Sequence, residues 1–175
     1  YRGMERYECM RIMFEEFNHR PAPDRRTIHE LTERKNAYYQ KLLEHAGPED
    51  LVLPGSVELI EALRAAQITA VVASGSKNAH QVIDHAGIRG YLDAVVDRYD
   101  VAETKPDPAI FRVALDKAGV PAAHAVGVED AVLGVESLHR AGIKAIGVGH
   151  YVKDADLVVD AIRHLTVGMM RRVLE

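Results

Sequence analysis

The apolar residues of the first 50 positions recur at helical spacing, with charged residues between them. One stripe consists of Met10, Met13, Phe14 and Phe17, and a second of Leu31, Tyr38, Leu42 and Leu43. Pro21-Ala22-Pro23 separates the two predicted helices, and Thr27 followed by Glu30 is typical of a capping box that opens the second. Gly47 and Pro48 are expected to end that helix. The pattern therefore predicts an all-helical segment over residues 1–50.

From about residue 51 the pattern changes to short apolar runs that alternate with helical stretches. The predicted strands cover residues 68–73, 94–96, 125–128, 144–148 and 157–159. Five helices are predicted as well. The first ends near residue 66, the second covers residues 77–86 and the third begins at 107–108. The fourth covers residues 131–141, and the last follows residue 165. Strands that alternate with helices indicate a mainly parallel sheet covered on both faces. We therefore expect an α/β protein, with a doubly wound, mainly parallel sheet over residues 51–175 and a small helical domain over residues 1–50.

Composition and charge narrow the functional classes. The chain has 175 residues, of which 47% are hydrophobic, and its formal net charge is −4, so the overall charge gives no reason to expect a nucleic-acid partner. No apolar run is long enough to cross a membrane. The single cysteine, Cys9, allows no internal disulfide and favours a cytoplasmic location. Because the first residue is Tyr1 and not Met, the translated product is expected to be longer.

The first candidate for chemistry is the segment from Ser74 to Asn78, which follows a predicted buried strand and precedes a helix. Gly75 lets the backbone bend there, and Ser76 is a suitable N-cap. Such a turn presents N–H groups, hydroxyls and the positive end of the helix dipole, which together can bind a phosphate. The alternative is an ordinary strand-to-helix turn that binds nothing.

Two further strand ends carry charged residues, and ligands of open parallel sheets bind at the carboxyl ends of the strands. Lys105, followed by Pro106, could place a point charge on a phosphate, although an isolated lysine is usually solvated. Glu129 and Asp130 are adjacent carboxylates that need a cation, and Mg²⁺ is the natural candidate. Alternatively, Asp130 caps the helix that begins at Ala131, which leaves Glu129 unexplained.

In this order, Ser74, Lys105 and Glu129-Asp130 resemble the second, third and fourth motifs of the haloacid dehalogenase superfamily of phosphotransferases. Within this superfamily, the sequence resembles the β-phosphoglucomutase-like subfamily most specifically. The segments that carry it are residues 73–78, 105–111 and 127–130, together with 34–39 and 3–6 in the helical region. Gly134 stands where many phosphatase branches of the superfamily have another Asp, which favours the mutase-like branch.

The resemblance implies a partial helical cap over residues 1–50 and a Rossmann-like core over residues 51–175. It also implies a Mg²⁺-dependent phosphoryl transfer that interconverts β-glucose 1-phosphate and glucose 6-phosphate. In the family an Asp becomes a covalent aspartyl phosphate, and a second Asp two positions later is the general acid and base. Their Asp-x-Asp-Gly pattern does not occur in residues 1–175. We therefore expect roughly 40 further N-terminal residues that carry it and the first strand, and we expect the chain alone to be inactive.

The same resemblance assigns roles to particular residues. Ser74 and Lys105 would contact the transferring phosphoryl group, and Glu129 and Asp130 would hold Mg²⁺. The expected substrate-binding residues are Arg6, Lys35, Ser74, Gly75, Ser76, Lys77 and Asn78, of which the first two would reach in from the cap. The partner would be a small phosphorylated sugar or metabolite, bound by a monomer.

Three alternatives remain open at this point. The first is a phosphatase that passes the phosphoryl group from the same aspartyl phosphate to water. The second is a non-catalytic fragment or pseudoenzyme, which the missing Asp-x-Asp-Gly pattern favours for this chain. The third is a phosphate-receiver signalling domain, which has no reason to carry a helical cap.

Overall fold

The computed structural model describes the backbone of residues 6–175 and the side chains from Tyr7 onward. The segment 3–5, which carries part of the resemblance, and the side chain of Arg6, which was assigned to substrate binding, lie outside the described residues. The helical part consists of α1 (Arg6–Ile12), the π-helical turn η1 (Met13–Phe17) and α2 (Arg25–Leu43). The described part of the predicted helical segment is therefore helical on both sides of the proline-containing break.

The cap of α2 differs from the prediction. Asp24 is the N-cap, and its Oδ1 accepts a hydrogen bond of 2.7 Å from the backbone N–H of Thr27. The predicted capping box of Thr27 and Glu30 is therefore wrong, because Asp is as good an N-cap as Thr and stands one turn earlier. Gly47 was expected to end the helix. It is instead the N-cap of a short following helix, α3 (Pro48–Leu51), with Pro48 at its first position.

The rest of the chain alternates between helices and strands. Its elements are α4 (Ser56–Ala65), β1 (Val71–Ala73), α5 (Ala79–His85), η2 (Arg89–Tyr91), β2 (Ala94–Val96), α6 (Ala109–Ala118), η3 (Ala122–His124), β3 (Val126–Glu129), α7 (Val132–Arg140), β4 (Lys144–Val148), β5 (Leu157–Val159), η4 (Ile162–His164) and α8 (Val167–Leu174). Each predicted strand is present, although β1 covers only the last three of the six residues predicted for it.

All strand pairs are parallel, but the strands form two separate sheets. In the first, β1 pairs with β2, with Val72 opposite Val95. In the second, β4 lies between β3 and β5, with Ile146 opposite both Val128 and Leu157. Since consecutive parallel strands are joined through helices, the connections are those of an α/β protein.

The core lies on both faces of the strands. Ala145 belongs to a cluster with residues of α6 and α7, whereas its neighbour Ile146 belongs to a second cluster with residues of α4 and α8. Both residues are completely buried, as expected for adjacent positions of a strand that is covered on two sides. The expected Rossmann-like α/β fold is therefore confirmed.

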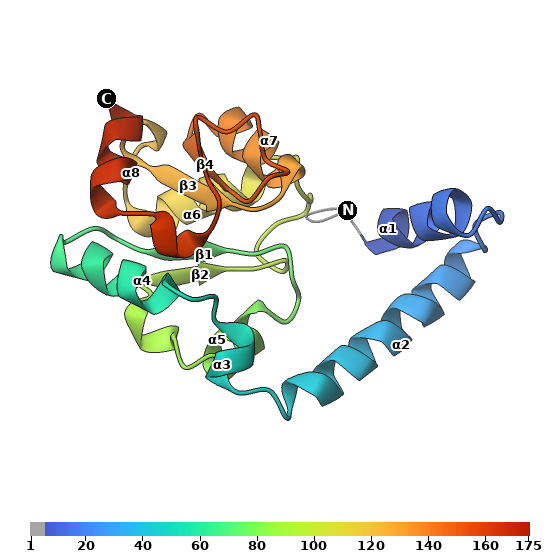
Figure 1. Ribbon diagram of the computed structural model, residues 1–175. Coiled ribbons are helices and arrows are strands. Elements are labelled where there is room, and N and C mark those ends of the chain that lie inside the picture. Colours follow the sequence, from blue (N-terminus) through green and yellow to red (C-terminus); the bar gives the residue numbers. More distant parts are fainter. Residues whose placement is uncertain (1–5) are drawn as a thin grey trace.

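Figure 1 shows α1 and α2 in blue, beside the α/β part and joined to it through the segment that leads to α3. Helix α3 packs near α5 and so belongs with the α/β part. The long helix α2 carries an exposed surface that includes Tyr38 and Leu42. No helix among the described residues is long and apolar enough to cross a membrane.

Candidate active site

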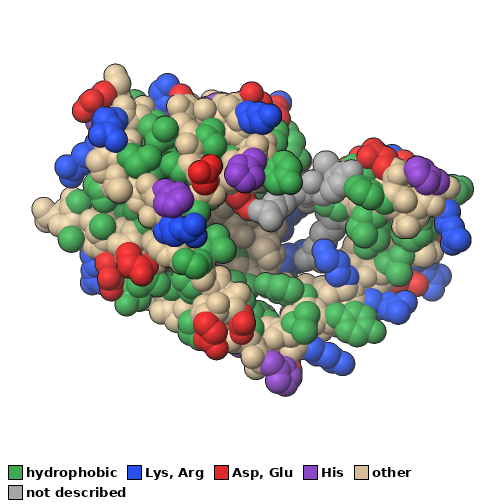
Figure 2. Space-filling model, viewed as in Figure 1, with side chains coloured by type: hydrophobic (Ala, Val, Ile, Leu, Met, Phe, Trp, Pro, Cys, Tyr) green, Lys and Arg blue, Asp and Glu red, His purple; other side chains and the backbone are tan. Residues whose placement is uncertain are grey.

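A cleft of about 960 Å³ lies between the helical part and the carboxyl ends of the strands. The space-filling view is hollowed between these two parts of the molecule (Figure 2). The cleft is lined by seven of the residues selected from the sequence: Ser74, Gly75, Ser76, Lys77, Lys105, Glu129 and Asp130. Three chain segments that are far apart in the sequence therefore meet at one opening.

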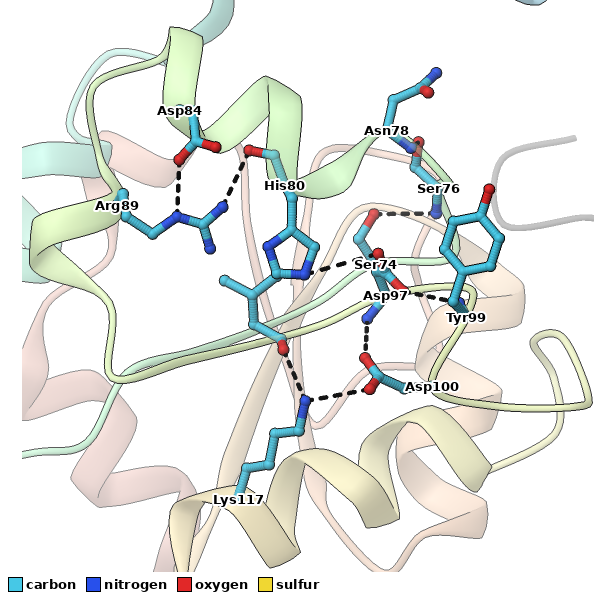
Figure 3. Close-up of polar contacts among 11 residues, drawn as sticks. Ser74, Ser76, Asn78, His80, Asp84, Arg89, Asp97, Tyr99, Asp100 and Lys117 are labelled. Carbon is cyan, nitrogen blue, oxygen red and sulfur yellow. Dashed lines mark hydrogen bonds and ion pairs between the residues drawn. The ribbon is translucent and has the colours of Figure 1, made fainter.

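Ser74 follows β1 directly, and its backbone N–H donates to the carbonyl of Val96 at the end of β2, at 2.9 Å. Its Oγ accepts a hydrogen bond from the N–H of Ser76 (Figure 3). Ser76 was predicted to be the N-cap of the next helix, but that helix begins three residues later, after Asn78. The Ser76 Oγ instead accepts from the N–H of Asn78, so the hydroxyls shape a turn that precedes the helix.

Gly75 lies in this turn with open space on the side where a Cβ would stand, and its φ is not in the left-handed region. The fold therefore does not require a glycine there. Because Gly75 has no side chain, it leaves room in the cleft that it lines.

A polar network supports the end of β2 behind Ser74 (Figure 3). Asp97 is buried, and its Oδ1 accepts from the N–H of Tyr99 at 2.7 Å, while its Oδ2 lies 3.7 Å from Nε2 of His80. The N–H of Asp97 donates to Asp100, and this bond is the main reason why the pKa of the Asp100 carboxyl is lowered. Lys117 of α6 bonds Asp100 as well. The network thus fixes the start of the loop that leads to Lys105.

Lys105 and Glu129 form a direct ion pair on the cleft wall, through Nζ and Oε1. Their side chains are only 9% and 10% exposed. The Lys105 ammonium also lies 4.6 Å from the ring centroid of Phe111 on α6, at cation–π distance. A lysine that sequence reasoning could not distinguish from a solvated one is therefore enclosed beside a carboxylate.

Glu129 also occupies the start of α7. Its Oε2 accepts from the N–H groups of Asp130, at 3.0 Å, and of Ala131, at 3.2 Å. The N-cap position is Ala131, so the alternative in which the Asp130 side chain caps this helix is wrong. A Cβ placed on Gly134 would come within 2.2 Å of the Glu129 carboxyl carbon. Glycine at this position therefore leaves the space that the carboxylate fills.

These residues suit part of a Mg²⁺ site. Magnesium takes six oxygen ligands and is often held by one or two carboxylates, with water and phosphate oxygens in the other positions. Glu129 and Asp130 supply two such carboxylates at the cleft. Among the described residues, no group of three or more His, Cys, Asp or Glu side chains is placed to hold a metal ion. The described residues therefore offer part of the ligand set for Mg²⁺ and not a complete one.

Two selected residues lie elsewhere. Lys35 is exposed on α2 and is not among the described residues that line the cleft. Asn78 is likewise not in the lining, and its Nδ2 donates to Oδ1 of Asn36 on α2, at 2.9 Å. This bond joins the helical part to the turn that carries Ser76.

Sequence reasoning missed the polar residues that α2 turns toward the cleft. The cleft is lined by Arg25, His29 and Thr32 of this helix. One helical turn after Thr32, Asn36 accepts a hydrogen bond from Asn78 of the α/β part. The spacing of these α2 residues, four, three and four positions, is the helical period. This polar stripe is therefore a signal that the sequence itself contains.

A family model described as haloacid dehalogenase-like hydrolase matches residues 4–142. β-Phosphoglucomutase of Bacillus subtilis is 37% identical over 148 residues, which are 83% of this chain and 65% of that protein. Phosphorylated carbohydrates phosphatase of Thermotoga maritima is 28% identical over 140 residues, or 78% of this chain and 60% of the phosphatase. The chain thus spans less than two thirds of the length of either relative.

Among solved structures, β-phosphoglucomutase from Clostridium difficile superposes with a TM-score of 0.86 at 29% sequence identity. The match covers 98% of this chain and 78% of that structure. The likeness therefore includes the helical part as well as the strands.

Proposed function

Because the chain belongs to the haloacid dehalogenase-like hydrolase family, we propose that it forms the phosphate-binding part of a Mg²⁺-dependent phosphotransferase that acts on sugar phosphates. The reaction proposed is that of a β-phosphoglucomutase, the interconversion of β-glucose 1-phosphate and glucose 6-phosphate. The likeness to two β-phosphoglucomutases supports this choice.

The observation that carries the proposal is the meeting of Ser74, Lys105 and Glu129 at one cleft. A buried ion pair is weak evidence for stability, because the cost of desolvating two charges offsets most of their attraction. The enclosed pair of Lys105 and Glu129 is therefore better explained by chemistry at the cleft than by stability alone. A hydroxyl and an ammonium group that line the same cleft suit a phosphoryl group, whose charge lies on its peripheral oxygens.

We assign the roles as follows. The Ser74 hydroxyl donates to a phosphoryl oxygen, and the Lys105 ammonium offsets the charge of the group during transfer. Glu129 and Asp130 hold Mg²⁺, which when bound supplies positive charge to the phosphoryl oxygens. The exposed face of Gly75, Ser76 and Lys77 receives the rest of the substrate. Lys35 and Arg6 remain proposed contacts from the cap.

The acceptor of the phosphoryl group is proposed to be an Asp outside residues 1–175, in an Asp-x-Asp-Gly sequence. Its carboxylate oxygen forms a bond to phosphorus while the bond from phosphorus to the sugar oxygen breaks. The second Asp gives its proton to the departing sugar oxygen. In the second step, a different sugar hydroxyl loses its proton to that Asp and takes the phosphoryl group from the aspartyl phosphate, whose bond to phosphorus breaks.

The second candidate is a phosphatase, and the similarity to the Thermotoga maritima phosphatase favours it. In that case water accepts the phosphoryl group from the same aspartate. The resemblance at Gly134, where many phosphatase branches have an Asp, supports the mutase proposal over this one, and a side chain there would displace the Glu129 carboxylate in this structure.

A single assay separates the two candidates. Protein expressed from the complete reading frame is incubated with β-D-glucose 1-phosphate and Mg²⁺, and products are followed by ³¹P NMR. Formation of glucose 6-phosphate supports the mutase, whereas inorganic phosphate without glucose 6-phosphate would reject it in favour of the phosphatase. No phosphorus-containing product with this or other sugar phosphates would reject both.

A matched pair of variants tests the site itself. Lys105→Met removes the ammonium from the cleft, and we expect kcat to fall by about 10²-fold or more. Lys153→Met removes an exposed lysine that is not in the cleft lining, and kcat should stay at the parent value. Equal activity of the two variants would contradict the role of Lys105.

A further inference from the structure

Ser137 is a polar residue in the core that no sequence motif accounts for. It lies on α7, is completely buried, and belongs to the same layer as the apolar residues Val135 and Leu138. Its Oγ donates a hydrogen bond of 2.7 Å to the backbone carbonyl of Asp107, which is 30 residues earlier in the chain. A buried hydroxyl that is satisfied by one distant carbonyl fixes the position of that carbonyl.

Asp107 stands two residues after Lys105, in the loop that precedes α6. Its other polar groups have local partners: the N–H donates to the carbonyl of Thr104 at 3.0 Å, and Oδ1 accepts from the N–H of Ala109 at 2.8 Å. Local bonds thus hold the loop to the start of α6. The bond from Ser137 is the one that ties it to α7.

Helix α7 is therefore linked to the surroundings of both members of the ion pair at the cleft. The backbone N–H groups of Asp130 and of the N-cap Ala131, just before its first residue, bind the Glu129 carboxylate, and Gly134 leaves the space for that carboxylate. Ser137, one turn beyond Gly134, holds the loop that carries Lys105. Glu129 is the last residue of β3, whereas Lys105 lies in the loop between β2 and α6, so α7 links two separate parts of the fold.

We propose that Ser137 is a positioning residue, which holds Lys105 against Glu129 through the carbonyl of Asp107. The proposal rests on the phosphoryl-transfer function proposed for Lys105. Ser137 touches neither substrate nor metal in this scheme. It reduces the number of positions available to the Lys105 ammonium, so that the ammonium faces the phosphoryl group without rearrangement.

The test observes Lys105 directly, without reference to activity. In protein expressed from the complete reading frame the lysines, which include the seven of this chain, are labelled with ¹⁵N, and the ammonium signals are recorded in ¹H–¹⁵N spectra. An ammonium held by a carboxylate over an aromatic ring should give a distinct, slowly exchanging signal. The Lys105 signal is identified as the one that is present in the parent spectrum and missing from the spectrum of Lys105→Arg.

In Ser137→Ala we expect this signal to move toward those of the exposed lysines or to be lost by exchange with water. Val135→Ala is the matched control, because it shortens a buried side chain on the same helix and leaves the hydrogen bond from Ser137 to Asp107 in place. It should leave the Lys105 signal in place. Ser137→Cys keeps the size and a weak donor, so it decides the question if Ser137→Ala does not fold, and its signal should shift less.

The catalytic readout is kept separate from this measurement. With the protein from the complete reading frame, Ser137→Ala should lower kcat by about 10- to 100-fold, with a much smaller change in KM. If the parent protein turns over no sugar phosphate, the proposed function fails, whereas the spectra still decide the role of Ser137. A Lys105 signal that is unchanged in Ser137→Ala and Ser137→Cys, or that is absent in the parent, would overturn the proposal.

Discussion

Substitution of Gly134 by alanine tests the geometry at the back of the cleft. Gly134 is buried within α7, and a Cβ there would lie 2.2 Å from the carboxyl carbon of Glu129 and 2.3 Å from its Oε1. Real Cβ contacts are not this short, so the carboxylate must move. As it moves, it leaves the ammonium of Lys105 and the N–H groups at the start of the helix.

Two effects of opposite sign decide the result. Alanine is favoured over glycine in a helix interior by about 1 kcal/mol. Displacement of the carboxylate removes charge-assisted hydrogen bonds, which together contribute about 2–4 kcal/mol when partly buried. We therefore expect Gly134→Ala to lower the free energy of unfolding by about 1–3 kcal/mol, which is opposite in sign to the effect of helix propensity alone.

The measurement is unfolding in urea, followed by far-ultraviolet circular dichroism because the chain has no tryptophan. Gly168→Ala is the control, since Gly168 lies in α8 and the nearest atom to its Cβ position is 3.9 Å away. That variant should be as stable as the parent or more stable. In a Glu129→Ala background the clash is absent, and Gly134→Ala should then be stabilising.

One result would refute this reasoning. If Gly134→Ala stabilises the parent protein as much as it stabilises the Glu129→Ala background, the Glu129 carboxylate does not fill the space beside Gly134. The assignment of that carboxylate to the cleft wall would then have to be given up.

Three further substitutions have expected outcomes. Asp24→Ala removes the N-cap of α2 and should lower the stability of the protein by about 1 kcal/mol in urea unfolding. The pKa of the Asp156 carboxyl is lowered chiefly by the N–H of Ala145, so its stabilising effect is complete above about pH 4 and is lost as the pH falls through its native pKa. Asp156→Asn should therefore destabilise the protein at pH 7, with a difference from the parent that narrows below pH 4. Asn36→Ala removes the bond to Asn78 and should speed amide hydrogen exchange in α2, and adding Asn78→Ala should change it no further.

The order of helices and strands could be predicted because it depends on periodicity, which the local sequence contains. The caps of α2 and α5 could not, since several residues near each start are acceptable caps. Asp24 was overlooked beside Thr27, and Ser76 was preferred to the turn that it forms with Asn78. The choice between such neighbours depends on where the rest of the chain fixes the helix.

The site was predictable in outline for a related reason. Ser74 and Lys105 follow strands β1 and β2, Glu129 is the last residue of β3, and parallel strands end at one edge. Their partners were not predictable, because a sequence pattern does not give distances between separate loops. The pairing of Lys105 with Glu129 and the bond from Ser137 to Asp107 both join residues more than 20 positions apart.

The division of the strands into two sheets has a consequence for the order of folding. Each parallel pair joins strands that are neighbours in the sequence, so each can assemble from a short stretch of chain. Closing the loop between two consecutive strands costs less entropy than bringing together strands from distant parts of the chain. The cluster that unites Val96 of one sheet with Ala145 of the other, through Ile110 of α6, is the long-range step. We therefore expect two early nuclei, and α6 and its apolar face should set the rate at which they join.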